Sequence, residues 1–129
     1  MKTRCEVNFS DERGEIRDIY YASPKEHCTI ITFTPDVSRA NHYHKETIQY
    51  TYVVEGNLKM ATCETDDEGN HLTEVKIEEI GPGDYIEHPP YHIHAFRSIT
   101  DATIIVFSNG IRGGVDYEKD VYRLKEPIL

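Results

Sequence analysis

The 129-residue sequence predicts an antiparallel all-β fold, a sandwich or a barrel, and two observations carry this prediction. First, short segments rich in β-branched and aromatic residues recur along the chain. Second, each segment ends at a break rich in Gly, Pro, Asn or Asp, such as Gly81-Pro82-Gly83-Asp84. The predicted strands are residues 16–21, 28–34, 49–54, 58–64, 72–80 and 103–108.

The character of the individual segments refines this prediction. Residues 49–54 are nearly all large, which is typical of a strand that is covered on both faces, so we expect a central strand there. Helical spacing occurs only in the acidic tail at 116–125, where Tyr117, Val121 and Leu124 share one side. The tail therefore allows one short C-terminal helix, or alternatively a final strand at 121–124.

Length and composition indicate one domain spanning residues 1–129, with a formal charge of −9. This charge repels phosphate backbones and anionic headgroups, which disfavours nucleic acid and membrane partners. No apolar stretch reaches the roughly 20 residues that span a bilayer, and no signal peptide is evident, so we expect a cytoplasmic protein. The three cysteines form no Cys-x-x-Cys pair and are expected to be reduced thiols. Open sheet edges favour a homodimer.

Seven histidines are many for this length, and four of them form two His-x-His pairs. Side chains on a strand repeat every two residues, so His42 and His44 are expected on one face. The same parity groups His92, His94 and Phe96. Neutral imidazole is the commonest protein ligand of first-row transition metals, and three imidazoles with one oxygen donor leave positions open for a substrate.

The spacing of these residues resembles the two motifs of the cupin superfamily, G-x5-H-x-H-x3,4-E-x6-G and G-x5-P-x-G-x2-H-x3-N. The positions that match are His42, His44, Gly56, Gly83, Pro89 and His94. The positions that differ are Asp36 for the first Gly, Gln49 for Glu, Tyr91 for the Gly before the last His, and Ser98 for Asn.

This resemblance implies a cupin-type double-stranded β-helix, also called a jelly roll, which binds a small molecule in its barrel. It also implies that His42, His44 and His94 are ligands of a divalent transition metal (Fe, Mn, Ni, Zn or Cu), with Gln49 as the fourth. An amide oxygen is a weaker donor than a carboxylate, so Gln49 is alternatively a hydrogen-bonding residue that orients a ligand, and Glu46 could replace it. The alternative for the three histidines is that they are polar residues of a barrel without metal.

Further candidate residues surround the histidines. Arg39, Tyr85 and Tyr91 are candidate catalytic residues of the pocket, since Arg39 could pair a substrate carboxylate or phosphate. The alternatives are a solvated Arg and tyrosines that fill the core. His92 competes with His94 as a ligand by parity, but its distance from Pro89 does not fit the motif. The remaining histidines, His88, His71 and His27, are expected at the surface or are given no role.

A narrower resemblance concerns Arg39-Ala40-Asn41-His42-Tyr43-His44-Lys45, which is similar to the R-G-x-H-A-H-K stretch of the sugar-nucleotide 3,4-ketoisomerases. The tail Asp116-Tyr117-Glu118-Lys119-Asp120-Val121-Tyr122 is loosely similar to their D-Y-x-x-D-Y ending. This resemblance implies a metal-free enzyme in which a histidine of the pair is the acid/base and Arg39 contacts the substrate.

Three functions therefore follow from the sequence. The first is a metal-binding cupin enzyme, of isomerase, epimerase or dioxygenase type, that acts on a small polar or anionic molecule. The second is a metal-free sugar-nucleotide 3,4-ketoisomerase. The third is a barrel that binds a small molecule without catalysis.

Overall fold

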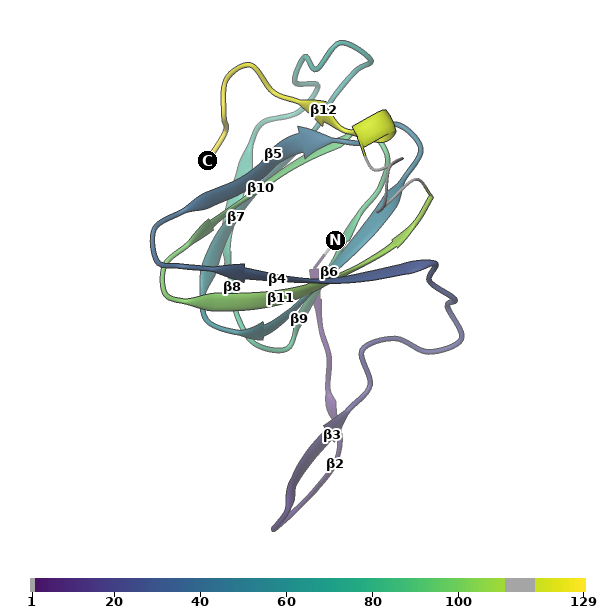
Figure 1. Cartoon of the computed structure of the whole chain (residues 1–129), viewed down its shortest axis with the longest axis vertical. Helices are drawn as coiled ribbons and strands as arrows, with labels where there is room; N and C mark the ends of the chain where they lie inside the picture. The colour runs from purple at the N-terminus through teal and green to yellow at the C-terminus, as the bar shows by residue number, and fades with distance from the viewer. Residues whose placement is uncertain (1, 111–117) are drawn as a thin grey trace.

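Two five-stranded antiparallel sheets face each other and form a barrel in the computed structural model, which describes residues 2–110 and 118–129 (Figure 1). The first sheet contains, in spatial order, β1 (Lys2–Arg4), β9 (Asp84–His88), β6 (Ile48–Glu55), β11 (Ala102–Asn109) and β4 (His27–Phe33). The second contains β12 (Tyr122–Arg123), β5 (Ser38–Tyr43), β10 (His92–Ser98), β7 (Leu58–Glu64) and β8 (Lys76–Ile80). The predicted antiparallel all-β class is confirmed.

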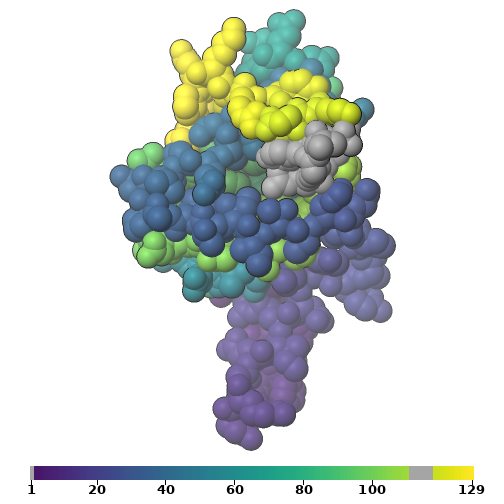
Figure 2. Space-filling view, viewed as in Figure 1, coloured from purple at the N-terminus to yellow at the C-terminus, as the bar shows by residue number. Residues whose placement is uncertain are grey.

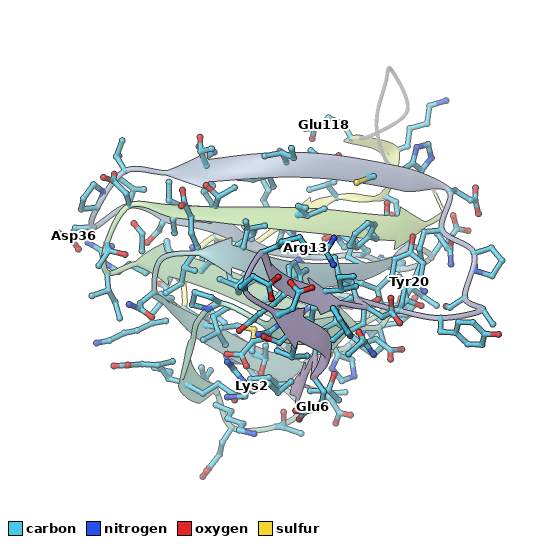
Figure 3. The ribbon with its side chains drawn as sticks, turned by 90° about the horizontal axis from the view of Figure 1, so that it is seen from below. Lys2, Glu6, Arg13, Tyr20, Asp36 and Glu118 are labelled. Atoms are coloured by element: carbon cyan, nitrogen blue, oxygen red, sulfur yellow. The ribbon has the colours of Figure 1, made fainter. Side chains whose placement is uncertain are left out.

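A two-stranded hairpin, β2 (Val7–Asp11) with β3 (Gly14–Arg17), projects away from the barrel (Figures 1 and 2). Figure 3 looks along the hairpin toward the barrel and shows Arg13, in the turn of the hairpin, in front of the sheets. The apolar side chains of Val7, Phe9 and Ile16 are exposed. The hairpin therefore has no buried core of its own.

The predicted strands are found, with shifted ends. The strand expected at 16–21 is confined to β3, and the strand expected at 72–80 begins only at Lys76. The strands β1, β2 and β9 were not predicted: β1 and β9 are short and lack a clear alternation of apolar and polar residues, and β2 alternates over only five residues. Strand β6 is the middle strand of its sheet, as expected.

The C-terminal segment contains a final strand, one of the two alternatives that its sequence allows. Residues 118–120 form one turn of 3₁₀-helix, and β12 then pairs with β5. The described part of 116–125 thus contains both a very short helix and a short final strand, and Tyr117 lies outside the described residues. Among the described residues, no helix is long and apolar enough to cross a membrane.

The core lies between the sheets and is made by alternate residues of each strand. In β6 the side chains of Gln49, Thr51 and Val53 are buried, whereas the side chains between them are only partly buried. The apolar part of the core is formed by Phe33, Val53, Leu58, Met60, Ile80, Ile86, Phe96, Ala102, Ile104 and Val106. The inward face of β6 is thus apolar at Val53 and polar at Gln49 and Thr51.

Gly56 closes the turn between β6 and β7 and is one of the motif positions. Its φ is +84°, and a Cβ atom there would lie 2.2 Å from the carbonyl oxygen of Asp101 and 2.6 Å from Cα of Ala102. Any other residue would be strained and would collide with backbone atoms. The glycine therefore allows the β6–β7 turn to pack against the start of β11.

Candidate active site

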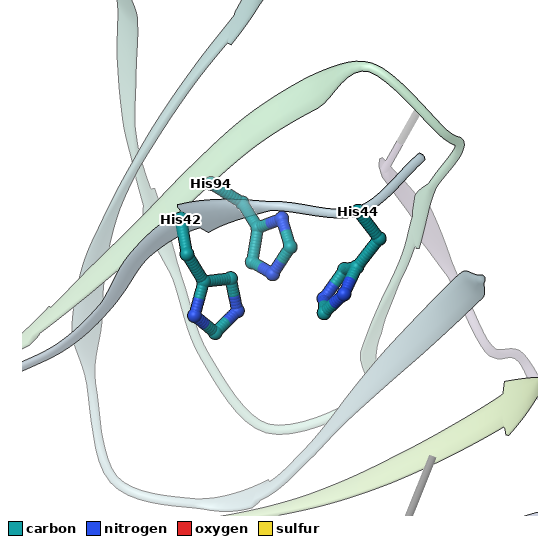
Figure 4. A group of neighbouring side chains, drawn as sticks. All are labelled: His42, His44 and His94. Carbon is teal, nitrogen blue, oxygen red and sulfur yellow. The ribbon is translucent and has the colours of Figure 1, made fainter. Parts of the chain in front are cut away.

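Three histidine side chains converge inside the barrel, as Figure 4 shows. The ring centroids of His42 and His44 are 4.9 Å apart, those of His42 and His94 are 4.8 Å apart, and those of His44 and His94 are 5.5 Å apart. One nitrogen from each ring lies within 4.8 Å of the others, and all three residues are buried. Two of these residues are contributed by β5 and the residue after it, and the third by β10.

The pairing of β5 with β10 brings these residues together. His94 lies opposite His42, and the register then shifts by one residue, so that Ala95 lies opposite Ala40. Ala40 and Asn41 have positive φ values of 70° and 55°, as expected where an extra residue is inserted into a strand. The side-chain oxygen of Asn41 accepts a hydrogen bond from the backbone N–H of Ile128. The bulge is thus anchored to the C-terminus.

A pocket of about 140 Å³ opens beside the histidines. Its polar lining includes His42, His94, Gln49 and Thr51, and Arg39 also contributes to it. The Arg39 guanidinium lies 5.3 Å from the ring centre of Phe33 and donates a hydrogen bond to the carbonyl of Thr32. Arg39 and Gln49, both predicted from the sequence, therefore lie at the pocket together with His42 and His94.

Hydrogen bonds to main-chain oxygens define the tautomers of His44 and His94. Nδ1 of His44 is 2.7 Å from the main-chain oxygen of Asp120, and Nδ1 of His94 is 3.3 Å from that of His92. A carbonyl oxygen only accepts, so Nδ1 carries the proton in both cases. In the neutral rings, Nε2 then keeps a lone pair that can accept a proton or bind a metal.

His88 was expected at the surface, and this expectation is wrong. Its side chain is 2% exposed, because in β9 it shares the inward face with Ile86. Its ring stacks on that of His94 at 4.4 Å, and its Nε2 is hydrogen-bonded to Oγ1 of Thr51 at 3.1 Å. Burial lowers the pKa of His88 to about 3, and burial together with the neighbouring histidines lowers the pKa of His94. Predicting β9 would have revealed this fourth histidine.

The structure does not place Tyr85 in the pocket. Tyr85 alternates with the inward-facing Ile86 and lies on the outer face of the sheet, where its ring stacks with that of Tyr50 at 5.9 Å. Burial raises the pKa of the Tyr85 hydroxyl, which has no hydrogen-bond partner among the described residues. Lys25 lies 3.7 Å from the centre of the Tyr50 ring. We therefore assign Tyr85 no contact with a ligand of the pocket.

Tyr91 is held at the rim of the barrel rather than in the pocket. Its hydroxyl donates a hydrogen bond to Oδ1 of Asp67 at 2.8 Å, and this bond raises the pKa of the hydroxyl. Its backbone N–H donates to the carbonyl of His44. Its φ is +63°, which the Gly of the cupin motif would adopt without strain. Tyr91 therefore supports the backbone next to His44.

The remaining candidates lie apart from the pocket. The Glu46 side chain is exposed, which does not favour its replacing Gln49. His92 is half-buried, with Nε2 3.7 Å from Oε1 of Glu64. His71 and His27 are exposed, as expected for His71. The three cysteines are free thiols.

The fold and the pocket define the class of protein. The barrel of two antiparallel sheets with inward-facing histidines is a cupin-type jelly roll, as the sequence predicted. Residues 9–110 match the family described as the polysaccharide biosynthesis C-terminal domain, and the chain belongs to this family. No curated protein matches the chain in sequence.

Three solved structures illustrate the likeness of the fold. The dTDP-4-dehydrorhamnose 3,5-epimerase from Sulfolobus tokodaii has a TM-score of 0.78 and 16% identity, over 93% of this chain and 73% of the other. The sugar 3,4-ketoisomerase QdtA from Thermoanaerobacterium thermosaccharolyticum, in complex with TDP, has a TM-score of 0.76 and 19% identity, over 97% and 88%. The 4-keto-6-deoxy sugar epimerase NovW from Streptomyces spheroides has a TM-score of 0.73 and 16% identity, over 87% and 64%.

Proposed function

We propose that this protein is an isomerase of a nucleotide-linked 4-keto-6-deoxy sugar, with His42 and His44 as the acid/base pair. The observation that carries the proposal is the buried histidine group beside a small pocket with Arg39 in its lining. The enzymes of similar fold include an epimerase of dTDP-4-dehydrorhamnose, a sugar 3,4-ketoisomerase in complex with TDP and a 4-keto-6-deoxy sugar epimerase. The chain spans 88% of the ketoisomerase but only 64–73% of the two epimerases, which favours the 3,4-ketoisomerase reaction among these activities.

The size of the pocket suits one part of such a substrate. Pockets that enclose a whole drug-sized ligand measure about 300–1,000 Å³. A pocket of about 140 Å³ therefore accepts the reacting sugar ring, while the nucleotide lies outside it. The Arg39 guanidinium can pair with a phosphate or polarise a sugar oxygen through its planar fork.

Proton transfer is the chemistry that this group of residues supports. A base removes the proton from C3, next to the C4 ketone, and the electron pair of that C–H bond forms a C3–C4 double bond while the ketone oxygen takes a proton. The resulting enediol loses the proton of its C3 hydroxyl, C3 becomes the ketone, and C4 takes a proton. No atom or electron is gained or lost. The neutral ring of His44, with its lone pair on Nε2, is suited to the first step.

The direct test is to incubate the protein with TDP-4-keto-6-deoxyglucose and to identify the product by NMR. We expect the 3-keto isomer from the wild-type protein and none from the protein with His42→Asn and His44→Asn. An epimer formed by the same histidines would place the protein with the epimerases instead. A substrate that neither binds nor reacts would refute the proposal.

A metal-dependent cupin enzyme is the second candidate, and the three-histidine group is the observation that favours it. The donor set fits, because three buried imidazoles with nearby nitrogens suit a first-row transition metal. His42, His44 and His94 would hold the metal, with the buried side chain of Gln49 nearby. A metal there would act as a Lewis acid on a substrate oxygen.

Element analysis of the protein, purified without added metal, separates the two candidates. The first candidate predicts turnover in protein that contains no metal, and the second predicts about one metal per chain and loss of turnover in EDTA. If a metal binds and Gln49 contacts it, Gln49→Glu tightens binding because it restores a negative charge. Unchanged affinity would make Gln49 a residue that contacts only the substrate.

A further inference from the structure

We infer that Asp120 is a positioning residue that determines which nitrogen of His44 carries the lone pair. The catalytic importance of this role rests on the proposed function. Asp120 is 2% exposed although it lies in the C-terminal segment, 76 residues from His44. It acts through two different groups. Its main-chain oxygen accepts the hydrogen bond from Nδ1 of His44, and its carboxylate binds the turn that follows His44.

The carboxylate is satisfied by the backbone of residues 45–47. Oδ1 accepts the N–H of Lys45 at 2.9 Å, and Oδ2 accepts the N–H groups of Glu46 at 3.0 Å and Thr47 at 2.7 Å. Burial acts to raise the pKa of Asp120, but these hydrogen bonds outweigh it and hold the pKa below its ordinary value. A carboxylate that accepts three N–H bonds is a strong local anchor.

This anchor explains how a segment of only one helical turn and a two-residue strand can position a buried side chain. The carboxylate binds Asp120 to the β5–β6 turn. The main-chain carbonyl of Asp120 is thereby held against the His44 ring. The imidazole of His44 is hydrogen-bonded to the main-chain carbonyl of Asp120 and not to its carboxylate. The main-chain carbonyl therefore determines the tautomer of His44. A carbonyl oxygen accepts hydrogen bonds and cannot donate one, so Nδ1 carries the proton and Nε2 remains the nitrogen with the lone pair.

The orientation of His44 thus depends on a side chain that never touches the substrate pocket. Partners that orient a histidine in this way typically change metal affinity or activity by about 10–100-fold when they are removed. We expect Asp120→Asn to lower kcat by about this factor, because the amide NH₂ faces backbone N–H groups and releases the segment. KM should change little, because Asp120 does not line the pocket.

The test is the tautomer of His44, read from its imidazole ¹⁵N shifts at about pH 8, where an unperturbed imidazole is neutral. His44→Asn identifies the signals. We expect the Nδ1–H tautomer in the wild type and a shift toward the Nε2–H tautomer in Asp120→Asn. The matched control is Asp66→Asn, since Asp66 also accepts backbone N–H bonds within a turn, from Glu68 and Asn70. This control should leave the tautomer and kcat unchanged.

The Nε2–H tautomer in the wild-type protein would overturn the inference, and so would an unchanged tautomer in a folded Asp120→Asn protein. If that variant does not fold, the wild-type spectrum alone tests the inference. We then expect a scalar coupling across the hydrogen bond between His44 Nδ1–H and the Asp120 carbonyl. None of these spectra requires substrate. The expected tautomer in a protein that turns over no keto sugar would refute the proposed function and leave the positioning role intact.

Discussion

The interior of the barrel and the N-terminal hairpin depart from ordinary burial in opposite directions. The barrel buries four histidines, whereas the hairpin exposes the apolar side chains of Phe9 and Ile16. Buried polar groups and exposed apolar patches are the informative exceptions to ordinary burial. The contrast motivates two separate proposals, a ligand for the barrel and a second copy of the chain for the hairpin.

The largest effect is expected from His42, which lines the pocket. General acid–base catalysis contributes about 10²–10⁴-fold to a rate, so His42→Ala should lower kcat by a factor in this range. The measurement is the initial rate with TDP-4-keto-6-deoxyglucose at saturating substrate. His71→Ala, at an exposed histidine, is the control and should retain the wild-type rate. Equal rates in both variants would contradict a catalytic role for the buried histidines.

The next effect concerns acid stability. The pKa of His88 is lowered to about 3 in the folded protein, from an unfolded value of about 6.5. Below about pH 6.5 the unfolded chain therefore binds a proton that the folded protein does not, and stability falls by about 1.4 kcal/mol per pH unit for this group. Urea unfolding of EDTA-treated protein between pH 7 and about pH 5 should show a smaller loss in His88→Gln than in His71→Gln. The same pH dependence in both would contradict a neutral His88.

The hairpin provides the third prediction. A two-stranded hairpin alone is only marginally stable in water, so we propose that its apolar side chains pack against a second copy of the chain. Phe9→Ser with Ile16→Ser should lower the molar mass in solution from dimer to monomer, as measured by light scattering. Tyr21→Ser, which changes an exposed side chain outside the hairpin strands, is the control. A wild-type protein that is a monomer at all concentrations would contradict the proposal.

The smallest effect is expected at Tyr85, on the outer face of the barrel. Within residues 2–110 and 118–129 its buried hydroxyl has no hydrogen-bond partner, so Tyr85→Phe removes an unsatisfied group and should stabilise the protein by up to about 1–3 kcal/mol. The value of kcat should not change. Thermal unfolding and initial rates test both parts. A large loss of kcat would return Tyr85 to the active site and contradict the assignment of the faces of β9.

Much of the barrel could be predicted because its signals are local. Parity along extended backbone placed His42 and His44 on one face, and the spacing to Gly56 and His94 identified the motif. His88 was expected at the surface, and Tyr85 was a candidate for the pocket, because β9 was not predicted and its alternation was not applied. That alternation turns Ile86 and His88 inward and Tyr85 outward.

Asp120 could not have been found in this way. Its hydrogen bonds with the β5–β6 region join residues more than 70 positions apart, and no local pattern predicts which turn an acidic residue in the tail will reach. The bulge at Ala40 and Asn41 is a similar case, since two positive φ values at non-glycine residues depend on tertiary contacts. Long-range hydrogen bonds therefore supply the part of the site that the sequence left open.

The measurement that tests the central claim most directly is proton exchange by metal-stripped protein in D₂O. ¹H NMR of TDP-4-keto-6-deoxyglucose would follow the C3 proton in the presence of EDTA. The account predicts that this signal disappears with the wild-type protein and persists with His44→Ala, because the barrel histidines remove that proton unaided. A signal that persists with the wild-type protein and disappears only when a transition metal is added would contradict it.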